Sequence, residues 1–189
     1  MRFAAPLLLA ATLLCTGAGM PSNLGRAPDD RQVETDIAAG LNAFRAKQGL
    51  PPLPRSPLLD QVAQAHAADL DEHHPDSGTD SRGLPCNLHS WSSQGPWTPV
   101  CYTADHAYAA LMWSKPIEIT KGAYPGFGYE IAYWSSKAVS ADQAIATWED
   151  SPGHRALMAQ TGPWKEPWRA FGVGVQGGYA VIWFGREPG

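Results

Sequence analysis

The chain has 189 residues, of which 44% are hydrophobic and 17% are charged, and its formal net charge is -4. This length and composition fit one globular domain with its own core, and exclude a disordered chain or a charged coiled coil. Because a phosphate backbone is bound by a basic surface, a negative net charge without any run of Lys and Arg argues against nucleic acid as a partner.

The first 18 residues have the pattern of a secretory signal peptide. Arg2 supplies the positive charge, an apolar stretch runs from Phe3 to Leu14, and small residues precede the cleavage expected after Ala18. The apolar stretch is shorter than the roughly 20 residues that span a bilayer, and no other segment approaches that length. We therefore expect a secreted or periplasmic protein without a membrane span.

Export leaves two of the three cysteines in the mature chain. Cys15 lies in the signal region, where lipidation is an alternative that the bulky Leu14 before it disfavours. Cys86 and Cys101 remain as an even pair in an oxidising compartment, which favours a disulfide over two buried free thiols. In the chain-entropy account, such a bridge stabilises the folded protein by about 3 kcal/mol.

Two helices are expected at the start of the folded part. Residues 19–30 are polar and contain Pro and Gly, which is typical of a tether, and a single domain follows over residues 31–189. Apolar residues at helical spacing predict a helix that ends before Gly49; they are Val33, Ile37, Leu41 and Phe44. A second helix begins with Ser56 as its N-cap and Pro57 in its first turn. Its apolar face comprises Leu59, Val62, His66 and Leu70, and His66 is expected to be a core residue.

The middle and the end of the chain predict shorter elements. Residues 71–101 are rich in Gly, Pro, Ser and Asp and predict a loop, and so long a loop in a compact domain is usually functional. Gly177 and Gly178 separate two alternating apolar runs, which predicts an antiparallel hairpin. The order of elements, without a βαβ repeat, indicates an α+β fold. The other predicted elements are a short helix over 103–113, a strand over 126–134 and a helix over 141–150 that begins with a capping box of Ser140 and Gln143.

The stretch "SPGHRALM" places a histidine in the first turn of a short helix. Ser151 is a suitable N-cap and Pro152 a suitable first helical residue, so His154 takes the third helical position. The positive end of the helix dipole disfavours protonation there, which keeps the imidazole neutral and its lone pair available to a metal or a proton donor. The alternative is that His154 only forms a hydrogen bond to a neighbouring loop.

Four stretches together resemble the CAP superfamily, which is named for cysteine-rich secretory proteins, antigen-five and pathogenesis-related proteins. They are "LNAFRAKQGLPPLPRSPLLDQVAQAHAADL", "NLHSW", "SPGHRALM" and "FGVGVQGGYAVIWFG", and the resemblance extends from about Val33 to Gly185. It implies a three-layer α-β-α sandwich with a central, mainly antiparallel sheet. It also implies a central cavity lined by two histidines and two acidic residues.

Carried over position by position, the resemblance makes His89 of "HS" and His154 of "GH" the two cavity histidines. The family usually shows "GEN" where this chain has "GYEIA", so Glu130 stands one place later in its strand, and the face on which it lies depends on the strand's register. Glu149, directly after Trp148, is the candidate for the second acid and ranks below Glu130. His89, His154 and Glu130 are thus the expected ligands of a divalent metal such as zinc.

Two functions follow as hypotheses from this set of residues. The first is a secreted binding domain whose His/Glu cleft holds a divalent metal and which binds an extracellular ligand, either a lipid, a glycan or a protein. It is favoured because the chain contains no G-x-S-x-G, no H-E-x-x-H and no Cys-His nucleophile pattern. The alternative is a metal-assisted hydrolase in which Glu130 or Glu149 acts as general base on a bound water.

The remaining histidines and the tryptophans leave alternatives open. His73 and His74 lie in a polar segment, where a solvated turn is favoured over a second metal site. His106 has no assigned role. Most of the eight tryptophans are expected in the core, whereas an exposed cluster of them would mark a platform for an apolar or carbohydrate ligand.

Overall fold

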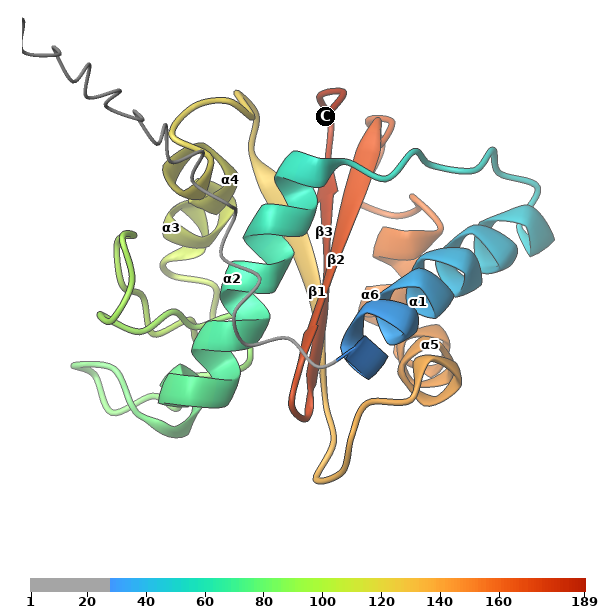
Figure 1. The fold of residues 1–189 in the computed structure, drawn as a ribbon. Coiled ribbons are helices and arrows are strands. Elements are labelled where there is room, and N and C mark those ends of the chain that lie inside the picture. The colour runs from blue at the N-terminus through green and yellow to red at the C-terminus, as the bar shows by residue number, and fades with distance from the viewer. Residues whose placement is uncertain (1–27) are drawn as a thin grey trace, which may run out of the picture.

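A three-stranded antiparallel sheet separates two helical layers in the computed structural model, which describes residues 28–189 (Figure 1). The strands are β1 (Gly128–Trp134), β2 (Ala170–Gln176) and β3 (Tyr179–Gly185), and their order in the sheet is β1-β3-β2. The predicted α+β class and its three layers are therefore confirmed. The expected signal peptide, most of the expected tether and Cys15 lie outside the described residues.

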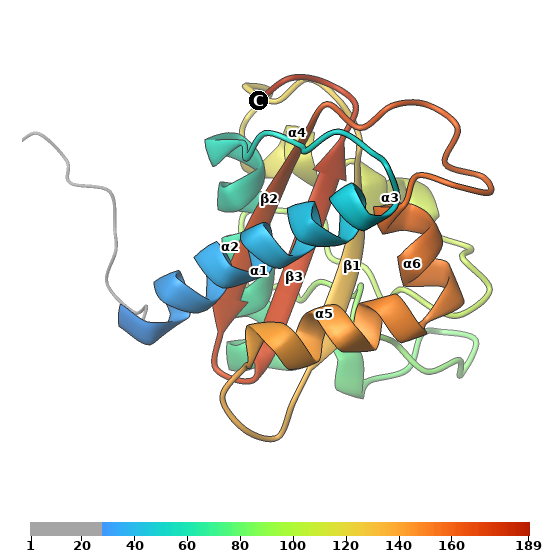
Figure 2. The ribbon, with the colours of Figure 1, turned by 90° about the vertical axis from the view of Figure 1, so that its right-hand side faces the viewer.

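One face of the sheet is covered by the first helix and by two helices from the C-terminal half, as the second view shows (Figure 2). Their buried side chains form one core with alternate strand residues such as Ile131 and Ile182. Helical periodicity had indicated this layer, since Ile37 and Leu41 of the first helix are fully buried in that core. These helices are α1 (Pro28–Lys47), α5 (Ala141–Asp150) and α6 (Pro152–Met158).

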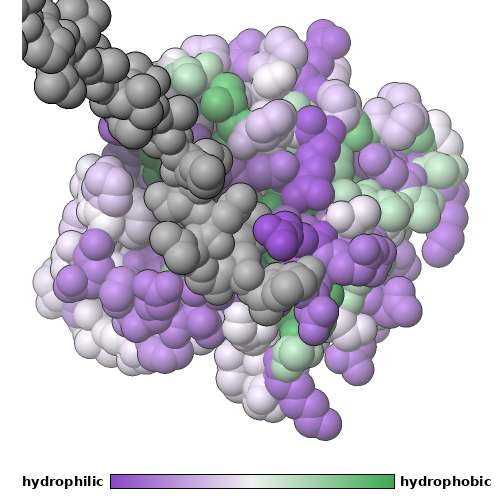
Figure 3. Space-filling model, viewed as in Figure 1, coloured by the Kyte–Doolittle hydropathy of each residue, from purple (hydrophilic) through white to green (hydrophobic). Residues whose placement is uncertain are grey.

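The opposite face is covered by the predicted second helix and two short ones (Figure 1). Strand residues that alternate with those of the first core, such as Val181 and Trp183, pack here. On the face in Figure 3, hydrophilic side chains dominate outside the grey region and apolar residues are scattered, because the apolar side chains fill the two cores. The helices of this layer are α2 (Pro57–His73), α3 (Ala109–Trp113) and α4 (Lys115–Ile119).

Helix α2 lies directly against the hairpin of β2 and β3. A Cβ atom on Gly172 or Gly174 would come within 2.4 Å of the α2 backbone, so only glycine permits this close approach. The predicted hairpin turn at Gly177 and Gly178 is confirmed, with a left-handed φ of 54° at Gly177. This close packing fixes the position of α2 relative to the hairpin.

The expected starts of the first two helices agree with the structure in different degrees. Helix α1 begins at Pro28, three residues inside the segment assigned to the tether, because Pro28 suits the first helical position and Asp29 and Asp30 suit the first turn. Helix α2 begins as predicted, since the Ser56 hydroxyl accepts a hydrogen bond from the Leu59 N–H at 3.2 Å.

Three local predictions need correction. The strand starts at Gly128 instead of residue 126, and the Ser140 side chain makes no capping bond at the start of α5, so the predicted capping box is absent. The helix predicted over 103–113 forms only over Ala109–Trp113. The reason is that residues 103–107 form a turn in which His106 has a left-handed φ of 58°, which interrupts a helix.

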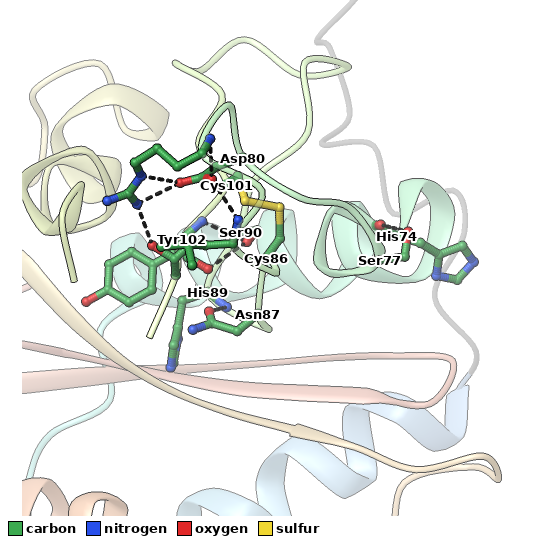
Figure 4. The surroundings of a disulfide bond; sticks show 12 residues. His74, Ser77, Asp80, Cys86, Asn87, His89, Ser90, Cys101 and Tyr102 are labelled. Carbon is green, nitrogen blue, oxygen red and sulfur yellow. Dashed lines mark hydrogen bonds and ion pairs between the residues drawn. A yellow bond between two sulfur atoms is a disulfide. The ribbon is translucent and has the colours of Figure 1, made fainter. Parts of the chain in front are cut away.

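The long loop after α2 is held by covalent and polar links rather than by extended secondary structure. Its regular parts are a 3-10 turn, Pro75–Ser77, and isolated bridges that pair Thr79 with Pro85 and Trp91 with Val100. The predicted disulfide between Cys86 and Cys101 is present and closes its second half (Figure 4). No helix within residues 28–189 combines the length and apolar character that a membrane-spanning segment needs.

Candidate functional site

A cavity of about 510 Å³ lies at the β1 edge of the sheet, where the two helical layers meet. Its walls come from the long loop, from α3, from β1, from α6 and from the segment after α6. It therefore brings together parts of the chain that are far apart in sequence. The lining residues are His89, Tyr102, His106, Ala109, Met112, Trp113, Tyr129, Glu130, Gly153, His154, Leu157 and Trp164.

Glu130 stands at the polar end of this cavity and faces the layer that contains α2. The β1–β3 register is continuous and pairs Glu130 with Trp183, whose indole packs with α2, so both side chains lie on that face. The Glu130 carboxylate accepts hydrogen bonds from two histidines, namely from Nδ1 of His66 and, at 2.7 Å, from Nδ1 of His89. The later position of Glu130 in "GYEIA" thus still brings it to the predicted histidine His89.

His66 is a buried partner of Glu130 that the sequence indicated only as a core residue. The prediction of burial is confirmed, because His66 is fully buried on α2 and stacked on the Trp91 ring at 4.1 Å. Its Nε2 donates to the Ser90 carbonyl oxygen at 2.9 Å and its Nδ1 donates to Glu130. Since both ring nitrogens face oxygens that accept, both carry a proton, and the imidazolium balances the Glu130 charge.

The charge state of Glu130 follows from this arrangement. Burial by itself favours the neutral acid, but the His66 charge and the hydrogen bonds from His66 and His89 outweigh it. The pKa of Glu130 therefore lies below its ordinary value, and the side chain is a carboxylate whose two oxygens both accept hydrogen bonds.

His89 is held at the cavity by its position within the disulfide-closed loop. Figure 4 shows its side chain extending from this loop toward the sheet. Its backbone N–H donates to Oδ1 of Asn87 at 3.0 Å, and its Nδ1–H donates to Glu130. In the neutral imidazole this leaves a lone pair on Nε2, which makes no hydrogen bond to any residue between 28 and 189.

His154 reaches the same cavity from the opposite layer, at the third position of α6 as predicted. Burial lowers the pKa of His154 below its ordinary value. The expected neutral imidazole is thus supported, with burial as the main cause. Its Nδ1 is buried and finds no hydrogen-bond partner in the described part of the chain.

The predicted ligands His89, His154 and Glu130 do not form a metal-spaced group of three in the described part of the chain. Among residues 28–189, no group of three or more His, Cys, Asp or Glu side chains is spaced to hold a metal ion. Both oxygens of Glu130 accept hydrogen bonds, whereas Nε2 of His89 and Nδ1 of His154 make no hydrogen bond within residues 28–189. Glu149 does not line the cavity, and its backbone carbonyl accepts a hydrogen bond from Arg155 at 2.6 Å.

Tyr102 and His106 line the cavity, although no sequence motif indicates this role for them. The Tyr102 hydroxyl lies 2.8 Å from Nδ1 of His106, and the Tyr102 ring packs edge-on against His89. The place of His106 at the cavity depends on the turn at residues 103–107, which helical periodicity does not indicate.

The other end of the cavity is apolar and aromatic. Met112 and Leu157 are buried there, and Tyr129 packs between two half-buried indoles, with ring centroids 5.7 Å from Trp113 and 5.1 Å from Trp164. The expectation that tryptophans serve the core is confirmed for Trp91, Trp148, Trp168 and Trp183. Trp113 and Trp164 instead form part of the cavity wall.

A profile of the cysteine-rich secretory protein family, CAP, matches residues 39–162. Among solved structures, the chain is similar to an extracellular SCP-domain protein of Bacillus anthracis, with 19% identity and a TM-score of 0.55 over 86% of this chain and 44% of that one. It is also similar to an outer surface protein of Borrelia burgdorferi, with 15% identity and a TM-score of 0.55 over 87% and 99% of the two chains.

A cysteine-rich secretory protein of Staphylococcus aureus is a third similar structure, with 14% identity and a TM-score of 0.53 over 86% of this chain and 41% of that one. The chain thus spans less than half of the Bacillus and Staphylococcus proteins and nearly all of the Borrelia protein. No curated protein sequence matches the chain. The TM-scores show that these proteins share the fold, and at such low identities the similarity shows nothing beyond the fold.

Proposed function

The chain belongs to the cysteine-rich secretory protein (CAP) family, and we propose that it is an exported domain whose cavity binds a small amphipathic ligand of the lipid class. The observation that carries this proposal is the division of the cavity into an aromatic end and a histidine-containing end. Cavities of roughly 300–1,000 Å³ that are mostly apolar, with a few convergent polar groups, are typical small-molecule sites.

The lining favours a lipid-class ligand over the other two classes considered. Met112, Leu157 and the rings of Trp113, Tyr129 and Trp164 offer an apolar surface that a hydrocarbon body covers without leaving polar groups unpaired. A glycan would need many more polar partners than this wall supplies. A protein partner needs an extended surface rather than a concave site of about 510 Å³.

Export is supported by three independent features. The N-terminal pattern is that of a signal peptide, and the disulfide between Cys86 and Cys101 suits an oxidising compartment. Two of the structurally similar proteins are described as extracellular or as outer surface proteins. We therefore place the binding cavity outside the cell or in the periplasm.

A divalent metal is a second proposed ligand, held by His89 and His154. In metal sites, the histidine commonly donates its other ring N–H to a carboxylate, which orients the ring. Glu130 stands in that relation to His89, and the unpaired Nδ1 of His154 is a second imidazole donor in the same cavity. Zinc bound there would supply Lewis acidity, and Glu130 would act as the positioning residue for His89.

The contacts of Glu130 favour binding over hydrolysis. A general base must accept a proton from water within hydrogen-bond reach. Both Glu130 oxygens instead accept hydrogen bonds from His66 and His89, and Glu149 does not line the cavity. We therefore retain the binding domain as the proposed function rather than the metal-assisted hydrolase.

The proposed binding is tested by blocking the cavity and measuring the fluorescence of N-phenyl-1-naphthylamine, a neutral apolar probe. We expect saturable binding to the mature, oxidised protein that is lost in Ala109→Trp, because Ala109 lines the cavity. Ala110→Trp is the matched control, since Ala110 is the next residue on α3, is exposed and does not line the cavity. Equal binding by both variants, or no binding by the wild type, would refute the proposal.

A further inference from the structure

We propose that His89, Tyr102 and His106 form a polar clamp that selects ligand head groups able both to donate and to accept a hydrogen bond, of which a hydroxyl is the simplest. This inference rests on the proposed function and specifies its ligand class as neutral, hydroxyl-bearing amphiphiles. It assigns a role to Tyr102 and His106. Neither residue belongs to a sequence motif or to the proposed metal site of His89 and His154.

The three rings of the polar clamp lie next to one another on the cavity wall. The Tyr102 ring centroid is 5.6 Å from that of His89 on one side and 5.6 Å from that of His106 on the other. All three residues line the cavity. A head group bound at the polar end can therefore contact the imidazoles of His89 and His106, which lie on either side of the Tyr102 ring.

The hydrogen bonds give the two imidazoles opposite characters. Nδ1 of His89 donates to the Glu130 carboxylate, so Nε2 of His89 is an acceptor. The Tyr102 hydroxyl has one hydrogen, and a neutral imidazole nitrogen is a stronger acceptor than a phenol oxygen. Tyr102 thus donates to Nδ1 of His106 at 2.8 Å, which leaves the hydrogen of His106 on Nε2 as a donor.

The position of His106 is built by the turn that precedes α3. Oδ1 of Asp105 accepts hydrogen bonds from the Thr103 hydroxyl at 2.6 Å and from the Ala107 N–H at 3.3 Å. Arg82 from the long loop donates to the other Asp105 oxygen at 2.6 Å. The resulting turn places His106 in a left-handed conformation with φ of 58°, which is uncommon for a non-glycine residue.

The opposite characters of His89 and His106 discriminate among head groups that carry the same hydrocarbon body. A hydroxyl donates to Nε2 of His89 and accepts from Nε2 of His106. An ester accepts only, so it leaves His89 unsatisfied. A carboxylate also accepts only, and it meets the His89 lone pair without a hydrogen to donate to it. The alcohol is thus the preferred ligand of the three.

The test measures displacement of N-phenyl-1-naphthylamine by 1-dodecanol, methyl dodecanoate and sodium dodecanoate, with EDTA present so that Nε2 of His89 stays free of metal. We expect 1-dodecanol to displace the probe at a concentration about tenfold lower than either of the others, as one satisfied donor–acceptor pair implies. Tyr102→Phe, which removes only the hydroxyl, should reduce this preference to about threefold or less.

Tyr108→Phe is the matched control, because Tyr108 is half-exposed two residues after His106 and does not line the cavity. It should keep the full preference. If Tyr102→Phe folds poorly, His106→Phe replaces an exposed side chain and should abolish the preference in the same way.

Each result decides a different point. Equal displacement by all three compounds, or a preference for the carboxylate, would overturn the polar clamp while leaving the apolar cavity as a binding site. An unchanged preference in both Tyr102→Phe and His106→Phe would also overturn it. Failure of the wild type to bind the probe at all would instead refute the proposed function itself.

Discussion

The two layers that enclose the sheet are built in different ways. The layer of α1, α5 and α6 consists of amphipathic helices whose apolar stripes meet one core. The layer of α2, α3 and α4 contains the long loop, which is fixed by the disulfide and by bonds such as that from the Ser92 N–H to the Asp69 carboxylate at 2.8 Å. The first layer contributes His154 to the cavity, whereas the second contributes His89, Tyr102 and His106, together with the buried His66 that holds Glu130.

This difference shows that most polar cavity residues are held in position by polar and covalent links rather than by helical packing. Loops that carry function are placed by the scaffold that holds them. Here the scaffold is α2 with the β2–β3 hairpin, and Glu130 at the sheet edge joins it to the loop through His66 and His89. Substitutions can remove each of these links separately.

Loss of the Glu130 carboxylate should have the largest effect. Glu130→Ala leaves the buried His66 charge without its partner, and removal of one member of a buried pair costs about 3–5 kcal/mol. Urea unfolding measures this loss. Glu149→Ala removes a carboxylate that lines no part of the cavity, and should change the free energy of unfolding by less than about 0.5 kcal/mol. Equal effects of the two variants would contradict the pairing.

Loss of the disulfide should come next. Replacing both Cys86 and Cys101 by serine opens a loop with a sequence separation of 15, which lowers stability by about 3 kcal/mol in the chain-entropy account. Hydrogen exchange locates the effect, since amide protection should fall within residues 86–101 and stay unchanged in α1 and α5. Uniform loss of protection in both layers would show that the disulfide stabilises the fold as a whole.

Zinc titration by calorimetry tests the link between the layers. We expect saturable binding to the mature, oxidised protein that is weakened by about tenfold or more in both His89→Ala and His154→Ala, because the two imidazoles come from opposite layers. His73→Ala is the control, since this exposed histidine lies outside the cavity. Binding that survives either cavity variant would place the metal elsewhere.

The smallest effect concerns pH and the turn that positions His106. Hydrogen bonds from Arg82 and Thr103 lower the pKa of Asp105 below its ordinary value of 3.8. A carboxyl with a lowered pKa in the folded state contributes stability that is present above pH 3.8 and is lost as the pH falls below it. Unfolding measured between about pH 5 and pH 2 should therefore depend less steeply on pH in Asp105→Asn than in wild type. Asp142→Asn, on the exposed side of α5, should match wild type.

Local patterns predicted much of the fold and the covalent framework. The stripe through Ile37 and Leu41, the N-cap at Ser56 and the glycine pair of the hairpin each depend on residues close in sequence, so periodicity and turn chemistry suffice to find them. The pairing of Cys86 with Cys101 is predicted because they are the two cysteines outside the expected signal peptide. The family resemblance predicted His89, His154 and Glu130 as site residues, and all three line one cavity.

The sequence by itself determined the elements, the class of fold and the chemistry available, because these depend on local preferences and on which side chains are present. Only the tertiary structure decided that His66 pairs with Glu130 across 64 residues, and that His106 stands beside Tyr102 at the same cavity as His154. Such contacts depend on strand register, on the path of a loop held by a disulfide and on a turn with left-handed backbone. These are long-range properties that no short window of sequence specifies.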